Sequence, residues 1–463
     1  MSGLAERNGG RAGLAVLVAI LLLGLGLRLD NAWQGRDPVF DATAYAKIAR
    51  NLDEGHGFTL GPTATQPASN YSPGLPLFVA GIYKLSGGVH ERTARLILAL
   101  IGTLSVLFTY LIARRLSGPL AGLIGAGAIA VYPALLEYQG MLMGESLAAS
   151  LLAGAVLSIL WAAGIDRRGL SRGWRGAGGS RTYTSPAGPP APRQDPRASR
   201  ARWLMPGVLF GALALVRPEY IGVVLLVSLV VFAKGWRSDW RRSMTSALLL
   251  LVGVVIVIAP WTMRNAIALD RFVPVSTGGG QVLFAGTYLP SDGDPEKVGA
   301  EVVARHPELF GPDAVRQLRL EQILARLAAQ RYPELETDKA LSRMGREQLW
   351  DDISEEPLEY AGFVATKVGR IWAHGPRDVM RMPPWEALHW MLVSLGLIGL
   401  AVLAAQRRWE ALLLATIFVA VTAISAVLVA SPRRVLVTMP LVAALAGVGA
   451  VVSRDSLARR WRS

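Results

Sequence analysis

Long apolar segments separated by short polar ones dominate the hydrophobic pattern of the chain. Most are near-continuous over roughly 17 to 25 residues, the length that an α-helix needs to cross a bilayer. The pattern therefore predicts an all-α polytopic membrane protein with about ten transmembrane helices. The expected spans are 13–29, 94–113, 120–136, 146–163, two short ones at 203–216 and 221–233, then 244–259, 387–405, 411–429 and 435–452.

Other segments show helical patterns without the length of a span. Residues 42–52 place their apolar side chains on one face of a helix, and 75–85 is apolar but too short to cross, which indicates an interfacial or re-entrant helix. Residues 261–384 mix glycine-rich turns with charged amphipathic stretches. This segment predicts a small, mainly helical extracytoplasmic subdomain, in which 360–372 lies on the membrane or dips into it.

The chain divides into three expected parts. Residues 1–260 form an N-terminal transmembrane module whose first outer loop is 30–91. Within it, 166–202 carries nine arginines and almost no apolar residues, so we expect a flexible cytoplasmic linker that cannot bury a core. The extracytoplasmic segment 261–384 follows, and 385–463 supplies the last spans and a basic cytoplasmic tail.

Composition and charge agree with a membrane protein and exclude other classes. Hydrophobic residues make up 52% of the chain and the formal net charge is +14, with the arginines gathered in loops between the apolar segments. This placement follows the positive-inside rule with both termini in the cytoplasm, so we expect an integral protein of a bacterial-type plasma membrane. There is no basic stripe with interleaved aromatic residues, which argues against nucleic acid. The absence of cysteine excludes disulfides and thiolate chemistry.

Four arginines depart from the positive-inside rule because they fall on the predicted outer side, at or beside helix ends: Arg217, Arg264, Arg433 and Arg434. A guanidinium fork suits pairs of phosphate oxygens, which suggests an anionic partner at this face. The alternative is that these side chains extend to lipid phosphates.

Two acidic residues lie on the same predicted side. Asp41 stands in the first outer loop, where Tyr45 and Tyr71 help to wall a partly dry cleft, and such a carboxylate can act as a general base on a hydroxyl. The alternative is a helix N-cap, because Asp41 directly precedes a helical stretch. Glu145 opens the fourth span and can bind a metal, an acceptor or an outer arginine, or it simply favours the helix N-terminus electrostatically.

Several short motifs occur in a characteristic order and together resemble the GT-C glycosyltransferases, in the family 39-like branch of protein O-mannosyltransferases and aminoarabinose–lipid A transferases. The motifs are Asp41-x-x-x-Tyr45-x-x-x-Ala49, Gly55-His56-Gly57-Phe58, Tyr71-Ser72-Pro73-Gly74-Leu75-Pro76, Gly144-Glu145-Ser146-Leu147, Leu215-Val216-Arg217-Pro218 and Pro260-Trp261-Thr262-Met263-Arg264-Asn265.

This resemblance implies transfer of a sugar from a polyprenyl-phosphate donor to a hydroxyl of a lipid, glycan or protein acceptor at the outer face, with inversion. Asp41 would be the base and Glu145 the second acidic residue. Arg433 or Arg434, together with Arg217, would bind the donor phosphate. The substrate cleft would include Tyr45, Tyr71 and Arg264.

The resemblance has limits. Ser72 precedes Pro73 where the aminoarabinose branch has lysine, and Ala42 follows Asp41 where the mannosyltransferase branch has an acidic pair, so the acceptor stays open. No cofactor is indicated, the five histidines lack metal-ligand spacing, and the resemblance leaves room for a divalent metal ion. The alternatives are a lipid-linked oligosaccharide ligase or polymerase, and a non-enzymatic transporter, which would show midplane charges and inverted repeats.

Overall fold

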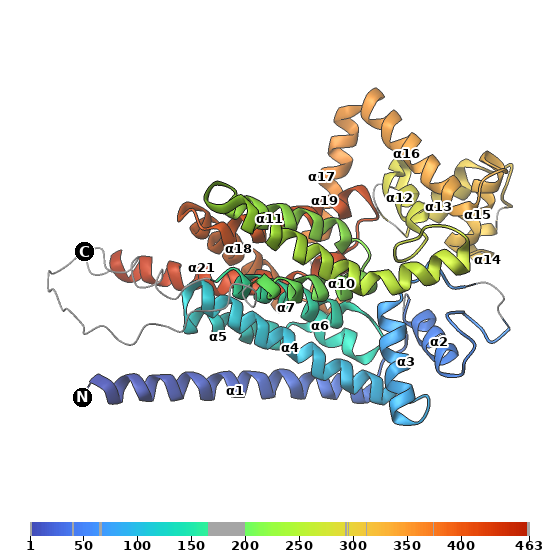
Figure 1. The fold of residues 1–463 in the computed structure, drawn as a ribbon. Helices are drawn as coiled ribbons and strands as arrows, with labels where there is room; N and C mark the ends of the chain where they lie inside the picture. Colours follow the sequence, from blue (N-terminus) through green and yellow to red (C-terminus); the bar gives the residue numbers. More distant parts are fainter. Residues whose placement is uncertain are drawn as a thin grey trace.

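The computed structural model describes residues 2–38, 41–63, 67–164, 200–291, 294, 296–311, 313–373 and 375–460, and the side chains of these residues except 2–10 and 457–460. All regular structure in these ranges is helical (Figure 1). Apart from 200–202, the linker expected at 166–202 lies outside the described residues. The helices are α1 (Ser2–Gln34), α2 (Ala42–Asp53), α3 (Gly74–Ser86), α4 (Glu91–Ser117), α5 (Pro119–Ala130), α6 (Pro133–Glu137), η1 (Tyr138–Gly140), α7 (Glu145–Ala162), α10 (Leu204–Val216), α11 (Tyr220–Leu269), α12 (Gly279–Thr287), η2 (Leu289–Ser291), α13 (Val298–Arg305), α14 (Ala314–Gln317), α15 (Leu320–Arg331), α16 (Thr337–Glu355), α17 (Pro357–Ala373), η3 (Asp378–Arg381), α18 (Pro383–Ala405), α19 (Trp409–Val427), α20 (Pro432–Leu436) and α21 (Met439–Arg460).

The predicted fold class, an all-α polytopic membrane protein, is confirmed, whereas the count of about ten spans is not. Within the described residues, six helices are long and apolar enough to cross a membrane, and a seventh is added if the bent pair formed by α5 and residues 133–140 is one span. The six are α1, α4, α7, α11, α18 and α19. Two helices that could have been counted, α3 and α10, are apolar but have only 13 residues each.

Part of the difference in count comes from α11. The spans expected at 221–233 and 244–259 both fall within this 50-residue helix, which is interrupted at Asp239 (φ −158°, ψ 86°). The chain turns back there, since a Cβ on Gly235 would lie 2.0 Å from the hydroxyl oxygen of Ser243. The two arms of α11 therefore run in opposite directions, and α10 packs closely against the second arm, where Gly207 faces the carbonyl of Leu250.

A second difference occurs in the span expected at 120–136, which is bent by 53°. Pro133 has no N–H and holds the preceding residue out of the helical region, and Tyr132 is accordingly extended (φ −68°, ψ 110°). The bend frees carbonyl groups at the end of α5. Arg28, buried in α1, donates hydrogen bonds to the carbonyls of Ile129 (3.0 Å) and Ala130 (3.2 Å). An arginine inside the bundle thus satisfies backbone groups that no water can reach.

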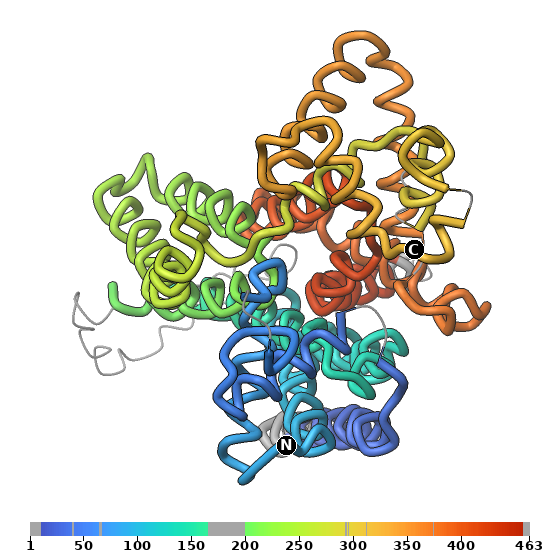
Figure 2. The backbone as a smooth tube through the Cα atoms, turned by 90° about the vertical axis from the view of Figure 1, so that its right-hand side faces the viewer, coloured from blue at the N-terminus to red at the C-terminus, as the bar shows by residue number. Residues whose placement is uncertain are grey.

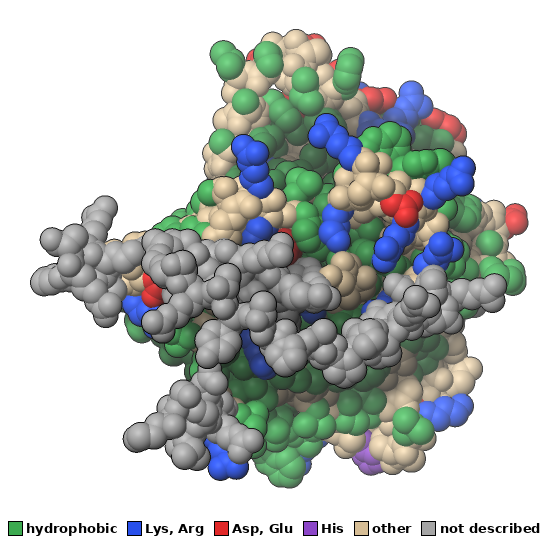
Figure 3. All heavy atoms as spheres, turned by 60° about the vertical axis from the view of Figure 1, so that its left-hand side comes forward, with side chains coloured by type: hydrophobic (Ala, Val, Ile, Leu, Met, Phe, Trp, Pro, Cys, Tyr) green, Lys and Arg blue, Asp and Glu red, His purple; other side chains and the backbone are tan. Residues whose placement is uncertain are grey.

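The spans run side by side, and both chain termini lie at the same end of the bundle (Figure 1). Lys and Arg side chains outnumber acidic ones on the face turned toward the viewer in Figure 3, which brings that end forward. The opposite end carries α2, α3 and the cluster of α12 to α16, and Figure 2 looks onto it. We call it the site end; it corresponds to the predicted outer side.

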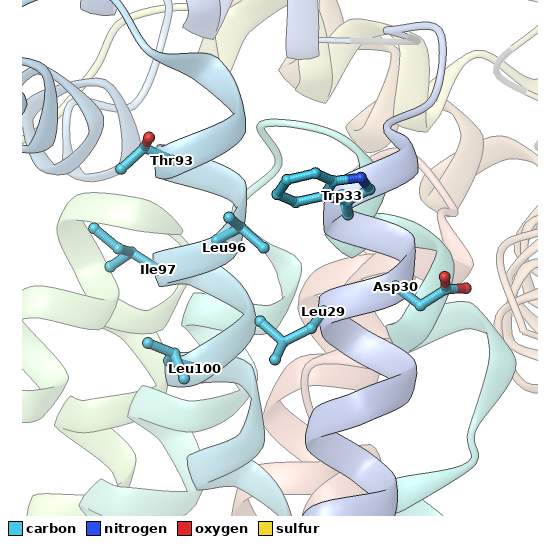
Figure 4. A pocket seen from close by; sticks show the side chains of 7 residues that line it. All are labelled: Leu29, Asp30, Trp33, Thr93, Leu96, Ile97 and Leu100. Atoms are coloured by element: carbon cyan, nitrogen blue, oxygen red, sulfur yellow. The ribbon is translucent and has the colours of Figure 1, made fainter.

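An apolar groove of about 540 Å³ lies on the surface of the bundle between α1 and α4 (Figure 4). Trp33 lies at the site end of this groove, and the carboxylate of Asp30 points away from it. Asp30 instead accepts hydrogen bonds from Gln34 on the next turn of α1. The groove is therefore a hydrocarbon-lined surface, formed by Leu29, Asp30, Trp33, Thr93, Leu96, Ile97 and Leu100.

Arg28 satisfies the carbonyl groups that the bend between α5 and α6 leaves free, so replacing Arg28 by leucine should destabilise the fold. The carbonyls of Ile129 and Ala130 would lose their donors inside the bundle, and we expect a loss of about 2–4 kcal/mol in the free energy of unfolding. Chemical denaturation in a fixed detergent measures this loss. Arg11→Leu, on the exposed part of the same helix, is the control; equal stability of the Arg28 variant would contradict the structural role.

Candidate active site

The centre of the site end is the carboxylate of Glu145, the first residue of α7, which is fully buried. Its Oε1 accepts hydrogen bonds from Arg217 Nη2 at 2.7 Å and from Arg433 Nε at 2.8 Å. Two arginines that are distant in sequence thus meet on one oxygen. Charge-assisted bonds this short are among the strongest in proteins.

Local packing fixes the position of Arg217. This residue ends α10 in an extended conformation (φ −139°, ψ 91°), and its N–H donates to the carbonyl of Leu213 at 2.7 Å. A Cβ on Gly74 would lie 2.7 Å from the backbone of Leu215, so the start of α3 presses against the end of α10. Gly144 allows a similar approach to Val216. The glycines of two recognised motifs therefore bring α3 and α7 onto the turn that carries Arg217.

Arg433 links the buried carboxylate to an exposed one. It lies in the short helix α20, which Pro432 begins, and its Nη2 is 2.8 Å from Glu145 and 3.6 Å from Asp41 Oδ2. The side chain of Asp41 is 44% exposed, compared with 15% for Arg433. One guanidinium therefore spans the distance between an anchored acid and an accessible one.

Asp41 occupies the N-cap position of α2, but its side chain forms no capping hydrogen bond. Only its backbone carbonyl serves the helix, by accepting the N–H of Tyr45 at 2.9 Å. The carboxylate is close to Arg433 instead. The structure therefore shows no capping bond from the Asp41 side chain, and a chemical role for it stays a prediction.

Two tyrosines stand beside Asp41. The rings of Tyr45 and Tyr71 pack edge to face with centroids 6.0 Å apart. Burial, with the Asp41 carboxylate as a further cause, raises the pKa of Tyr45 and also that of Tyr71. Both hydroxyls therefore stay protonated and can act only as neutral donors or acceptors at ordinary pH.

A second group of cations lies next to the first. Arg434 Nε is 3.7 Å from Glu219 Oε1, and its Nη1 donates to the carbonyl of Val429. The fully buried Lys367 donates to the carbonyl of Gly286 at 2.5 Å. Burial, aided by the charge of Arg434, lowers the pKa of Lys367 to about 8.

The charges of this region do not balance. Four cationic side chains face three carboxylates, so the formal sum is +1. Such a surplus next to the partly exposed carboxylate of Asp41 favours an anionic ligand. The cations are Arg217, Arg433, Arg434 and Lys367, and the carboxylates are Asp41, Glu145 and Glu219.

Arg264 is placed apart from this centre. Its guanidinium lies over the rings of Trp261 (4.9 Å) and Phe58 (5.8 Å) and donates to Asn265 Oδ1. The sequence pattern grouped it with the other outer arginines. In the structure it joins the packing between α11 and the loop that follows α2.

Three residues near the centre had no assigned role in the sequence analysis. Glu219 and Lys367 complete the charge group, and Tyr138 has a buried hydroxyl without a hydrogen-bond partner among the described residues. The second oxygen of Glu145 is likewise buried without such a partner. A lysine within the apolar stretch 360–372 was the one sequence signal for Lys367, whereas nothing in the sequence distinguished Tyr138.

The described residues contain no group of three or more His, Cys, Asp or Glu side chains that could hold a metal ion. The two central carboxylates, Asp41 and Glu145, both lie against Arg433. A protein cation therefore already occupies the space between them. The residues present do not fit a divalent metal site, and no step proposed below uses one.

Comparison with known proteins gives a family match over part of the chain. Residues 68–178 match the family model described as dolichyl-phosphate-mannose-protein mannosyltransferase. No curated protein sequence matches the chain significantly.

Solved structures give a fuller match in three dimensions. The archaeal oligosaccharyltransferase AglB from Archaeoglobus fulgidus, in complex with an inhibitory peptide and a dolichol-phosphate, shares 16% identity with a TM-score of 0.55; the match covers 96% of this chain and 50% of AglB. ArnT from Cupriavidus metallidurans bound to undecaprenyl phosphate shares 16% identity, with 96% and 78% coverage and a TM-score of 0.37. The present chain therefore spans about half the length of the oligosaccharyltransferase whose fold it shares.

Replacing Glu145 by glutamine tests whether this carboxylate holds the site end together. The change keeps the shape but leaves Arg217 and Arg433 as buried cations without their counterion, which should cost about 3–5 kcal/mol in the free energy of unfolding. Denaturation of the variant, with exposed Glu334→Gln as control, measures the effect. A loss no larger than that of the control would show that the two arginines find other partners.

The low pKa of Lys367 makes stability depend on alkaline pH. Its pKa is about 8 in the folded chain against an ordinary 10.5, so the unfolded chain binds the proton more tightly. Stability should therefore rise as pH increases from about 8 to 10.5 and be flat below. Lys367→Met removes this dependence, so the variant should be more stable by roughly 1–3 kcal/mol at pH 7 and lose that advantage at pH 10. Denaturation at both pH values checks this, and an equal difference at both would contradict it.

Proposed function

We propose, for this GT-C glycosyltransferase-like membrane protein, that it transfers a sugar from a polyprenyl-phosphate donor to an acceptor hydroxyl at the extracytoplasmic face of the membrane. The observation that carries the proposal is the bridge that Arg433 makes between buried Glu145 and exposed Asp41. The candidate base, Asp41, thus lies beside Arg433, the side chain that we expect to bind the donor phosphate.

Asp41 acts on the acceptor. Its carboxylate takes the proton of the acceptor hydroxyl as the oxygen attacks the anomeric carbon of the sugar. Attack comes from the face opposite to the phosphate, so the configuration inverts. The neutral hydroxyls of Tyr45 and Tyr71 stand beside this carboxylate and can bind sugar hydroxyls without competing for the proton.

The arginines act on the donor. As the bond between the anomeric carbon and the phosphate oxygen breaks, its electron pair stays with the phosphate, which leaves as polyprenyl phosphate. Arg433 and Arg434 have the fork geometry to bind its oxygens, and the surplus positive charge stabilises the charge that develops. Glu145 touches neither reactant in this scheme; it holds Arg433 and Arg217 in place.

The acceptor can be a lipid, a glycan or a protein. AglB is an oligosaccharyltransferase whose solved structure holds an inhibitory peptide and a dolichol-phosphate. An oligosaccharide ligase or polymerase that uses lipid-pyrophosphate glycans is the second candidate, since the same cationic group would suit a pyrophosphate. A non-enzymatic transporter fits this group less well, because the linked ion pairs of Asp41, Glu145 and Glu219 lie together at one end of the bundle.

Replacing Asp41 by asparagine should abolish transfer without loss of donor binding. Purified protein in lipid is offered radiolabelled polyprenyl-phosphate monosaccharides and, in parallel, polyprenyl-pyrophosphate oligosaccharides, with total membrane lipid and glycan as acceptors. We expect transfer from a monophosphate donor that falls at least about a hundredfold in Asp41→Asn, because the base is lost.

Asp37→Asn is the matched control, since Asp37 is exposed in the same loop. It should keep full activity. Transfer from pyrophosphate donors alone would favour the ligase, and a fully active Asp41→Asn would refute the role of the base.

A further inference from the structure

A second polar cavity lies on a different face of α2 from Asp41 and Tyr45. It has a volume of about 250 Å³ and is open at the site end. Nothing in the proposed transfer reaction uses it. The loop after α1, the helix α2, the first turns of α4 and residues 140–142 form its walls, with lining residues Arg36, Pro38, Ala42, Thr43, Ala46, Lys47, Arg50, Glu91, Arg95, Gly140, Met141 and Leu142. We call it the basic pocket.

The basic pocket is strongly cationic. Four cations, Arg36, Lys47, Arg50 and Arg95, share it with one carboxylate, Glu91, which gives a formal charge of +3 from 4 − 1. Three of the four are guanidinium groups, which bind pairs of phosphate oxygens well. A concave surface of this charge attracts a compact anion with more than one negative oxygen.

The cations of this pocket are only loosely paired within the protein. Arg50 and Arg95 lie 3.6 Å and 4.0 Å from the carboxylate of Glu91, beyond the 2.7–2.9 Å of a charge-assisted hydrogen bond. By contrast, the arginines on Glu145 lie at 2.7 and 2.8 Å. Arg95 Nε also donates to the carbonyl of Ala32 at 2.9 Å. The ion pairs of the basic pocket are nevertheless longer than those at Glu145, so a ligand can bind its cations without breaking a short ion pair.

Arg36 and Lys47 are available in the same way. Arg36 lies 3.6 Å from Glu137, whose other oxygen is already held by Arg377 at 2.7 Å. Lys47 is exposed and has no carboxylate within ion-pair distance among the residues that the structure describes. An anion can therefore bind to both without breaking a strong pair.

The position of the pocket relative to the membrane spans indicates which anion it binds. It lies where α1 ends and α4 begins, at the site-end boundary of two membrane spans. At the same level, Arg92 stacks on Trp33 with 4.6 Å between the guanidinium and the ring centroid. Tryptophan and arginine side chains of this kind occupy the headgroup region of a bilayer. Lipid phosphates are the anions concentrated at that depth.

We propose that the basic pocket binds the phosphoryl headgroup of an anionic lipid in the adjacent leaflet. Ala42 lines the pocket and directly follows Asp41, so a bound headgroup lies against the helix that presents the candidate base. The binding site stands independently of the reaction. That the bound lipid is also the acceptor rests on the proposed function.

The test measures lipid binding directly. Full-length protein in detergent is titrated with phosphatidic acid or phosphatidylcholine, and bound lipid is counted by native mass spectrometry. Wild type is compared with Lys47→Gln/Arg50→Gln and with the matched control Lys84→Gln/Arg305→Gln, which removes two exposed charges outside the pocket at the same end of the bundle. Thermal unfolding confirms that all three proteins are folded. Inorganic phosphate is added as a competitor in a separate arm.

We expect wild type to prefer phosphatidic acid over phosphatidylcholine by about tenfold or more, since several charge-assisted contacts distinguish the two. The pocket variant should lose that preference, while the control keeps it within about twofold. Equal binding by the pocket variant, or an equal loss in the control, would overturn the proposal. Inorganic phosphate that displaces the lipid at equal concentration would overturn the assignment to a lipid headgroup.

Discussion

A single buried carboxylate determines how the site end is assembled. Glu145 has no exposed surface and accepts hydrogen bonds from Arg217 and Arg433 on the same oxygen. Removing one partner of such a group would leave an uncompensated charge inside the protein, at a cost far above that of a surface pair. The start of α7, the turn between α10 and α11, and the short helix α20 must therefore come together in one arrangement.

This anchoring explains how an accessible residue can be held precisely. Asp41 is almost half exposed and forms no capping bond, so its own helix does little to orient its side chain. Arg433 is the group beside it, and Arg433 is fixed from the other direction by Glu145. Buried Glu145 thus orients Arg433, and Arg433 in turn orients Asp41. The carboxylate of Asp41 remains open to a substrate. A preorganised charge arrangement of this kind needs little rearrangement during reaction.

Sequence reasoning succeeded where the hydrophobic pattern or a motif carries the information. The all-α membrane class is confirmed, as is the resemblance to GT-C glycosyltransferases. The outer placement of Arg217 and Arg433 had suggested an anionic partner, and the structure shows an internal one, Glu145. The count of about ten spans is not confirmed: Pro133 bends one expected span, whereas the two spans expected on either side of Asp239 are the two arms of α11. Arg28 and Lys367 were missed because their partners are backbone carbonyls of other helices, and no sequence pattern records such contacts.

The guanidinium–carboxylate distance distinguishes the arginines that hold the fold together from those that can bind a ligand. At Glu145 and Glu137 the closest guanidinium contacts are 2.7 Å, and these pairs join segments far apart in sequence. Around Glu91 the contacts lengthen to 3.6 and 4.0 Å; the Arg50 pair joins α2 to α4, and the Arg95 pair lies within α4, one turn apart. The first group is committed to the fold, because breaking it would leave buried charge unpaired. The ion pairs of the second group give little stability, so selection for stability alone does not account for four cations gathered in one cavity.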